Sequence, residues 1–344
     1  MAYHKVKIES WLDAIFRQAK EKAVYGLVRS GKNLSYQRLR EKTDVVLFET
    51  RPTEPIKFFF YFPSEPVAAF PEEPFREEEK RVLLGVKACD LEALKTADYV
   101  YRLGDAVEPH YYSRRNNTLL IGSDCTRPIP TCFCNLHGRY CYPQEYFDIN
   151  LSPLNKEIMI ETGSPRGEEF LSELNLDLSE VTETDLNLRD KNRREYLEIV
   201  KMVNTSFETK KPYSEIVRES GAATKTWKKY GQEMCVQCHA CNLGCPTCYC
   251  FSFSDLAEKN GMKRYKSWDS CLASSFARMA SGATPRRSRW ELFRYHYYHK
   301  FDFLNTALGF DACTGCGRCI EGCLGRIDKR QVLSDLEKEI NGQD

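Results

Sequence analysis

Short apolar runs recur through the first 161 residues of the chain and predict the strands of a buried sheet. They are bounded by Pro, Gly or charged residues, and they cover residues 57–62, 81–86, 118–122 and 157–161. After the second run, Leu91, Leu94 and Ala97 recur at the spacing of one helix face. Strands that alternate with helices indicate an α/β domain.

The N-terminal segment predicts an amphipathic helix, because Ile8, Trp11 and Ile15 share one helical face. Charged residues such as Glu9 and Asp13 interrupt this segment, so it lacks the apolar core of a secretory signal. No run of about 18 consecutive apolar residues occurs, so we expect no membrane span. These features favour a cytoplasmic protein.

The distribution of cysteines divides the chain. Eleven of the 16 cysteines lie from Cys235 onward, and we place a domain boundary near residue 215, which gives domains at 1–215 and 216–344. The chain has 50 Lys and Arg against 49 Asp and Glu, which argues against nucleic acid or an anionic membrane as its partner. In a reducing compartment, dense cysteines indicate metal binding or redox chemistry before disulfides.

Two stretches of the second domain, CVQCHACNLGCPTCYC (235–250) and CTGCGRCIEGC (313–323), share one cysteine spacing. Both contain C-x2-C-x2-C-x3-C, the spacing that bacterial-type ferredoxins use for [4Fe-4S] clusters. A structural zinc site has four ligands and no use for a third cysteine at the same step. The spacing therefore predicts two iron–sulfur clusters.

The spacing also predicts which cysteines share a cluster. Three thiolates on a tight loop hold one cubane, and the fourth cysteine, three residues later, points to the other cluster. The expected ligand sets are Cys235, Cys238, Cys241 and Cys323 for the first cluster, and Cys313, Cys316, Cys319 and Cys245 for the second.

Small residues in the two loops, Ala240, Gly315 and Gly317, let backbone amides approach the sulfurs, and we expect His239 to adjust the potential rather than bind iron. Pro246 follows the first motif, whereas Leu324 follows the second.

Sixty-seven residues separate Cys245 from Cys313, so we expect an insertion at about 251–308 between the two motifs. Within it, residues 286–300 carry five Arg or Lys and predict a basic helix. Its charges are either a solvated face or a positive surface that offsets the clusters or docks an acidic partner. The expected fold is thus an α/β domain followed by an α-rich, ferredoxin-like dicluster domain with a helical insertion.

Three further cysteines lie just before this insertion or within it, and their role stays open. Cys248, Cys250 and Cys271 are either buried thiols near the clusters or ligands to something further.

A second group of cysteines follows two predicted strands of the first domain. GVKACD (85–90) and IGSDCTRPIPTCFC (121–134) place these candidate ligands on loops at the carboxyl ends of strands, where α/β sheets bind ligands: Cys89, Asp90, Cys125, Cys132 and Cys134. They either pack as small apolar residues or hold a third metal cluster. Cys141 and three histidines, His4, His110 and His137, give no comparable signal.

Five motifs, taken in order, resemble those of the iron–sulfur beta subunit of cytoplasmic sulfhydrogenases and of the corresponding iron–sulfur subunit of anaerobic sulfite reductase. They are GVKACDLEAL, TCFCNL, CNLGCPTCYC, SWDSC and CTGCGRCIEGC, and the resemblance runs from about Lys57 to about Ile327. It implies an electron-transfer subunit of an oxidoreductase complex in anaerobic metabolism. Such a subunit relays single electrons between two partners: a flavin (FAD) and NAD(P)-binding diaphorase subunit, and a catalytic redox subunit.

The resemblance also maps two clusters onto the eight motif cysteines and matches Cys89, Cys125, Cys132 and Cys134, with Asp90, to a third site. No nucleotide-binding glycine loop or nucleophile–base signature is visible, so we expect no substrate site in this chain. Two alternatives remain. The first makes the N-terminal cysteine site catalytic at a thiol or disulfide substrate, and the second is a zinc-bearing scaffold.

Overall fold

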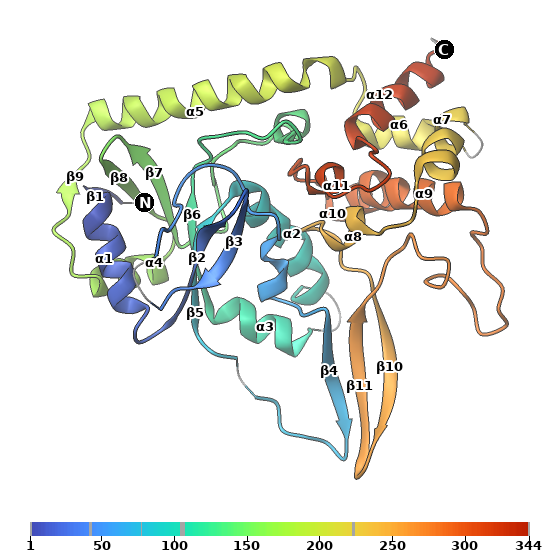
Figure 1. Ribbon diagram of the computed structural model, residues 1–344, viewed down its shortest axis with the longest axis horizontal. Helices are drawn as coiled ribbons and strands as arrows, with labels where there is room; N and C mark the ends of the chain where they lie inside the picture. Colours follow the sequence, from blue (N-terminus) through green and yellow to red (C-terminus); the bar gives the residue numbers. More distant parts are fainter. Residues whose placement is uncertain (1, 41–42, 77, 104–106, 222–223, 343–344) are drawn as a thin grey trace. The chain divides into compact units, whose positions relative to one another are not determined.

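The computed structural model describes residues 2–40, 43–76, 78–103, 107–221 and 224–342 (Figure 1). The chain forms two compact units. Unit 1 comprises Met1–Phe60 and Glu77–Val203, and unit 2 comprises Tyr61–Arg76 and Asn204–Asp344. Among the described residues, no helix has the length and apolar character needed to cross a membrane.

Unit 1 is built on a mixed eight-stranded sheet with the order β3-β2-β5-β6-β7-β8-β1-β9. Its strands are β1 (Tyr3–Lys7), β2 (Ala23–Ser30), β3 (Asn33–Arg38), β5 (Arg81–Val86), β6 (Thr118–Ser123), β7 (Ile149–Leu154), β8 (Glu157–Thr162) and β9 (Ser179–Glu180). Its helical elements are α1 (Ile8–Gln18), η1 (Ile56–Phe59), α2 (Ala88–Tyr101), α3 (Pro109–Asn116), η2 (Cys134–His137), α4 (Pro165–Glu173) and α5 (Glu183–Asn204), of which the last residue lies in unit 2.

The middle of this sheet is parallel and apolar. β2, β5, β6 and β7 run parallel, and Leu83, Leu84 and Ile121 have no exposed surface. Near-continuous apolar runs are typical of strands that are covered on both faces. Because β5 and β6 are parallel neighbours, the segments that follow Val86 and Ser123 leave the sheet on the same side, at the carboxyl ends of the strands.

The predicted helix at the N-terminus is confirmed as α1. Trp11 and Ile15 are fully buried and belong to one core cluster with Phe170 and Leu171 of α4. The predicted strands at 81–86, 118–122 and 157–161 are also confirmed.

The strand predicted at 57–62 is wrong, because its first residues form the 3-10 turn η1. Its aromatic ring at Phe59 packs edge-on against Tyr25, at 5.0 Å between centroids. A short apolar run fits a buried turn as well as a buried strand, so periodicity could not separate them.

The long helix α5 is held to the sheet of unit 1 by two partly buried ion pairs. Lys5 Nζ on β1 lies 2.9 Å from Asp185 Oδ2 in the first turn of the helix. Further along the same helix, Arg193 Nε lies 2.7 Å from Oδ2 of Asp124, the residue directly after β6. The first ion pair fixes the start of α5 to β1, and the second fixes α5 beside the segment that follows β6.

Unit 2 combines a small sheet with short helices. Its strands, in the order β10-β11-β4, are β4 (Ser64–Phe70), β10 (Phe251–Glu258) and β11 (Gly261–Trp268). Its helical elements are η3 (Thr205–Phe207), α6 (Tyr213–Glu219), α7 (Lys225–Lys228), the π-helix η4 (Lys229–Met234), α8 (Ala240–Leu243), α9 (Arg289–Tyr297), the π-helix η5 (Tyr298–Phe303), α10 (Leu304–Leu308), α11 (Arg318–Glu321) and α12 (Lys329–Ile340).

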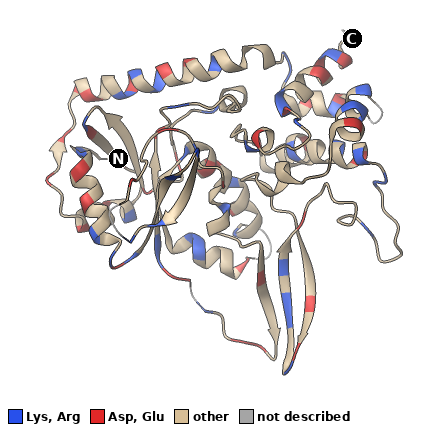
Figure 2. Cartoon of the chain, viewed as in Figure 1, with Lys and Arg blue, Asp and Glu red and all other residues tan. Residues whose placement is uncertain are grey.

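The insertion between the two cysteine motifs is only partly helical, which corrects the expected fold. It begins with the antiparallel β10–β11 hairpin, and helices appear only from Arg289 onward. Figure 2 shows basic residues along this hairpin. β11 pairs with β4 of a distant sequence segment, so its strand character depends on a partner that local sequence does not reveal. The expected basic helix is confirmed as α9, with Phe293 and Tyr297 buried and Trp290 half-buried.

Helix α9 and η4 approach closely at Gly231. A Cβ atom on Gly231 would lie 2.6 Å from Trp290 Cα and 2.9 Å from Phe293 Cβ. Backbone atoms cannot rotate away as a side chain does, so the absence of a side chain sets this distance.

We predict that Gly231→Ala lowers the free energy of unfolding by about 2–3 kcal/mol, because overpacking forces η4 and α9 apart. Gly282→Ala is the control, since its Cβ meets nothing within 4 Å but its φ is +80°. The control should lose only about 1–2 kcal/mol, from backbone strain. Denaturant unfolding of both variants checks this, and an equal loss in the two would contradict the steric explanation.

Candidate iron–sulfur centres

The two cysteine motifs of unit 2 have the same backbone conformation. Gln237 and His239 have φ values of 53° and 62°, and the equivalent Gly315 and Gly317 have values of 64° and 76°. Left-handed residues between right-handed or extended ones form concave nests of backbone N–H groups, which bind anions and iron–sulfur clusters. The first motif therefore adopts this conformation with two non-glycine residues, whereas the second motif adopts it with two glycines.

A short helix follows each nest in the same way. The His239 carbonyl accepts hydrogen bonds from Asn242 N and Leu243 N, both at 2.9 Å, as α8 begins. The Gly317 carbonyl accepts from the two equivalent amides of α11 at 3.0 and 3.1 Å. The two helices pack together, and a Cβ on Gly322 would lie 3.4 Å from Ala240 Cβ.

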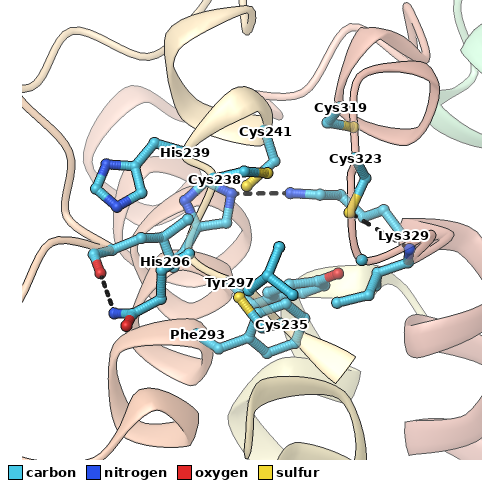
Figure 3. A pocket seen from close by; sticks show the side chains of 15 residues that line it. Cys235, Cys238, His239, Cys241, Phe293, His296, Tyr297, Cys319, Cys323 and Lys329 are labelled. Atoms are coloured by element: carbon cyan, nitrogen blue, oxygen red, sulfur yellow. Dashed lines mark hydrogen bonds between the residues drawn. The ribbon is translucent and has the colours of Figure 1, made fainter. Parts of the chain in front are cut away.

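This packing brings cysteines of both motifs to one cavity. Figure 3 shows these side chains facing the cavity: Cys235, Cys238, Cys241, Cys319 and Cys323. The first four-cysteine set expected from the spacing, including the crossed Cys323, thus lines a single space. Apolar side chains, among them Leu272, Phe293 and Ile327, make up much of the remaining wall.

The second expected set also converges. Around the Cys319 thiol, the neighbouring cysteines are Cys316, Cys313 and Cys245, so the fourth member again comes from the other motif. Burial raises the pKa of Cys319 above its usual value, and burial raises the pKa of Cys241 to about 12. These thiols are therefore protonated at neutral pH without metal, and binding a cluster releases their protons.

Buried cations lie beside both sets. Lys329 Nζ is 3.0 Å from His296 Nε2 at the wall of the cavity. Burial, followed by the nearby Lys329 ammonium, lowers the pKa of His296, so this imidazole is neutral. On the other side, Lys300 Nζ lies 3.4 Å from Cys245 Sγ and donates to Ala312 O at 2.9 Å. These ammonium groups match the negative charge of thiolate-bound clusters.

The cysteines of unit 1 gather near the carboxyl end of β6. The buried side chains of Cys141, Tyr196 and Val200 pack together, with Cys125 and Cys134 against them. Burial, followed by the thiols of these cysteines, raises the pKa of the Tyr196 phenol: Cys125, Cys132, Cys134 and Cys141. Tyr196 on α5 therefore lies at the centre of a group of four cysteines.

Cys141 belongs to this group, although the sequence analysis did not single it out. The amide of Cys125 donates to the Cys141 carbonyl at 3.0 Å, which places the two residues side by side. Its spacing, seven residues after Cys134, is symmetric with the seven-residue step from Cys125 to Cys132. This symmetry is the signal from which its membership could have been predicted.

Cys89 and Asp90 begin helix α2 after β5. Cys89 is half-buried and Asp90 has no exposed surface. Cys89 and Cys125 both lie near the ammonium of Lys87, which is fully buried and donates to Ser123 Oγ at 2.7 Å and Leu47 O at 3.2 Å. Burial lowers the pKa of Lys87. The structure thus adds Lys87 to the residues at the carboxyl ends of β5 and β6.

The loop that carries Cys125 is anchored through Asp124. The Arg193 guanidinium donates to both carboxylate oxygens, at 2.7 and 3.1 Å, and Asn150 Nδ2 donates to Oδ1 at 3.1 Å. Arg193 also stacks on Tyr142, at 4.0 Å from the ring centroid, and its carbonyl accepts from Cys141 Sγ at 3.8 Å. One residue, Arg193, therefore orders the loops on both sides of the cysteine group through its side chain and its carbonyl.

Among the residues that the structure describes, no three His, Cys, Asp or Glu side chains are grouped tightly enough to hold a single metal ion. A cubane places different demands on its ligands, because its four thiolates bind four different irons. The cavity between the two motifs, the convergent thiols, the nests and the buried ammonium groups fit such a cluster.

The remaining histidines have different surroundings. His239 occupies a left-handed position at the start of α8 and lines the cavity. His110 Nδ1 lies 3.8 Å from Glu78 Oε1, and the His137 ring lies 5.6 Å from that of Phe133.

The class of this protein follows from the known proteins that it resembles. Residues 234–327 match the model of the 4Fe-4S dicluster domain family, which covers both motifs and the insertion. The chain is also 32% identical over 348 aligned residues to sulfhydrogenase 2 subunit beta of Pyrococcus furiosus, with 99% of this chain and 100% of that protein covered. No solved structure matches the chain.

The second part of the chain is therefore an iron–sulfur dicluster domain. The whole chain belongs to the family of sulfhydrogenase beta subunits, and it is an iron–sulfur electron-transfer subunit.

We predict opposite effects for two substitutions in the nests. His239→Gly should raise the free energy of unfolding by up to about 1 kcal/mol, because it removes the strain of a left-handed L-residue, whereas Gly317→Ala should lower it by about 1–2 kcal/mol. Thermal unfolding under anaerobic conditions, followed by circular dichroism, checks both. Destabilisation in both variants would show that the imidazole of His239 contributes contacts that outweigh its backbone strain.

We also predict that Asp124→Asn lowers the free energy of unfolding by about 3 kcal/mol, because the half-buried Arg193 loses its charged partner. Asp190→Asn is the matched control, since Asp190 Oδ1 lies 2.8 Å from Arg189 Nη2 but its side chain is 45% exposed. The control should lose less than about 1 kcal/mol. Equal losses in denaturant titrations would mean that Asp124 is no anchor.

Proposed function

We propose that this chain relays single electrons between a flavin subunit that reacts with NAD(P)H and a catalytic redox subunit of the hydrogenase, sulfite reductase or heterodisulfide reductase type. The observation that carries the proposal is the convergence of cysteines from two distant motifs on shared sites in unit 2. The full-length relative supports it, since by its name that protein is one subunit of a sulfhydrogenase.

Two ligand sets follow from this proposal: Cys235, Cys238, Cys241 and Cys323 for the first cluster, and Cys313, Cys316, Cys319 and Cys245 for the second. A [4Fe-4S] cluster supplies one-electron chemistry at a potential set by burial, charge and hydrogen bonds to sulfur. The surrounding residues set these conditions. The nests direct amide N–H groups inward, Lys300 and Lys329 offset negative charge, and Phe293 and Tyr297 exclude water.

A third centre in unit 1 is part of the proposal. Its thiolates are Cys125, Cys132 and Cys134, and we infer that Cys141 supplies the fourth, because the thiols of these four surround Tyr196. Cys89 and Asp90 then lie beside the ligands, where Lys87 provides a positive charge close to Cys89 and Cys125.

We predict that crossed variants share a phenotype. Cys241→Ser and Cys323→Ser should each weaken the same reduced-cluster signal in electron paramagnetic resonance, and Cys316→Ser and Cys245→Ser should both weaken the other. The reason is that each fourth cysteine belongs to the cluster of the opposite motif. If Cys323→Ser instead matched Cys316→Ser, the ligand sets would be uncrossed and the proposed arrangement would be wrong.

We further predict that the purified chain, once reduced, passes electrons to a one-electron dye but does not oxidise NADH or NADPH alone, because it supplies clusters and no nucleotide site. Adding the flavin subunit should couple NAD(P)H oxidation to dye reduction. NAD(P)H oxidation by the chain alone would contradict a relay role. Activity on a thiol or disulfide that disappears in Cys132→Ser would instead favour a catalytic site in unit 1.

A further inference from the structure

Three cysteines outside the two motifs line a second cavity of unit 2. This cavity is bounded by Cys248, Cys250 and Cys271, together with Asn242, His296, His299 and Lys300. Neither ferredoxin-type ligand set uses these three thiols. Cys271 is 4% exposed and the other two are half-buried.

The β10–β11 hairpin explains why these cysteines meet. Cys250 directly precedes β10, and Cys271 follows β11 by three residues. The strands pair Phe251 with Trp268 at the base of the hairpin, and Asp269 N donates to Cys250 O at 2.9 Å. Pairing with β4 holds β11 in place, through the buried contact of Lys266 Nζ with Glu65 Oε1 at 3.2 Å. The hairpin therefore brings Cys250 and Cys271 together, although 20 residues separate them in the sequence.

Polar side chains are directed at the sulfurs of this cavity. Asn242 is 2% exposed, and its Nδ2 donates to Cys250 Sγ at 3.4 Å and to Cys271 Sγ at 3.5 Å. His296 Nδ1 lies 3.4 Å from Cys271 Sγ. An amide that donates to two sulfurs suits thiolates that bind metal, because such donors stabilise their negative charge.

The charge balance of the cavity also favours thiolates. Lys300 is 5% exposed, and its Nζ contacts Cys245 Sγ, Thr247 Oγ1 and Ala312 O, all of which are neutral while the thiol is protonated. A buried ammonium without negative charge nearby is costly. Cys245, a member of the second ligand set, would supply part of that charge once its cluster is bound, and Cys248, the next thiol near this ammonium, would supply more as a metal-bound thiolate.

We propose that Cys248, Cys250 and Cys271 hold a further iron–sulfur cluster in unit 2, with His299 as the fourth ligand. His299 lines the same cavity, whereas His296 already contacts Cys271 through Nδ1 and Lys329 through Nε2. Three cysteines and one histidine complete the four protein ligands of a cubane, and imidazole in place of a thiolate raises the potential of a cluster.

The position of this centre suggests its role, which rests on the proposed relay function. Cys248 lies beside Cys245 of the second set, and Cys271 has Cys241 of the first set among its neighbours. The additional centre would thus adjoin both ferredoxin-type clusters and provide an exit or entry point for electrons. The ligand assignment itself does not depend on that role.

The first experiment compares metal content in full-length protein purified anaerobically. We expect the Cys250→Ser/Cys271→Ser double variant to contain about four iron and four acid-labile sulfide fewer per chain than the wild type. Cys125→Ser/Cys134→Ser in unit 1 should lose a similar amount through the other proposed centre, so all four substitutions together should remove about eight iron per chain. Unchanged iron in the first double variant, or loss of zinc in place of iron, would overturn the inference.

Paramagnetic resonance of the same samples separates this inference from the proposed function. Both ferredoxin-type signals should persist in Cys250→Ser/Cys271→Ser if only the additional cluster is lost. Loss of all signals would indicate that the dicluster fold has failed, and the wild type then provides the test. Its reduced clusters should show hyperfine coupling to a directly bound imidazole nitrogen, which disappears in His299→Ala and persists in His239→Ala. Absence of this coupling in the wild type would overturn the assignment of His299.

Discussion

The contact between α8 and α11, two helices of four residues each, is the constraint on which the chemistry of unit 2 depends. Each helix begins directly after a left-handed residue, His239 or Gly317, and a single glycine separates its last residue from its motif's fourth cysteine. Because the helices pack against each other, the fourth cysteine of either motif is carried to the loop of the other. The close approach of Gly322 to Ala240 leaves little room for larger side chains at this contact.

Compensation of negative charge is the second requirement, and the helices after the hairpin provide it. Lys300 on η5 and Lys329 at the start of α12 are both buried and have thiols or a neutral imidazole as neighbours. Buried cations are stable only beside negative charge, so these lysines and the thiolates stabilise one another when clusters are bound. The basic character of residues 286–300 is therefore partly internal: Lys300 contacts Cys245, and Arg289 donates to the Cys235 carbonyl.

Local patterns predicted those parts of the fold that local interactions decide. The amphipathic α1, the buried strands β5, β6 and β8, and the basic helix α9 all have a periodicity that exists within one segment. The predictions failed where a partner distant in sequence decides the outcome. Residues 57–62 begin as a turn rather than a strand, and the insertion begins as a hairpin, because β11 pairs with β4 about two hundred residues earlier in the chain.

The sequence by itself determined the chemistry of this protein, since cysteine spacing specifies a [4Fe-4S] ligand pattern wherever the chain folds. It also determined the family, through motifs that span most of the chain. Only the tertiary structure decided which further cysteines lie together. Cys141 lies with Cys125, Cys132 and Cys134 around Tyr196 of α5, and Cys271 meets Cys250 through strand pairing. Spacing describes neighbours along the chain, whereas these groups form because sheet edges, ion pairs and hairpin register bring distant thiols to one place.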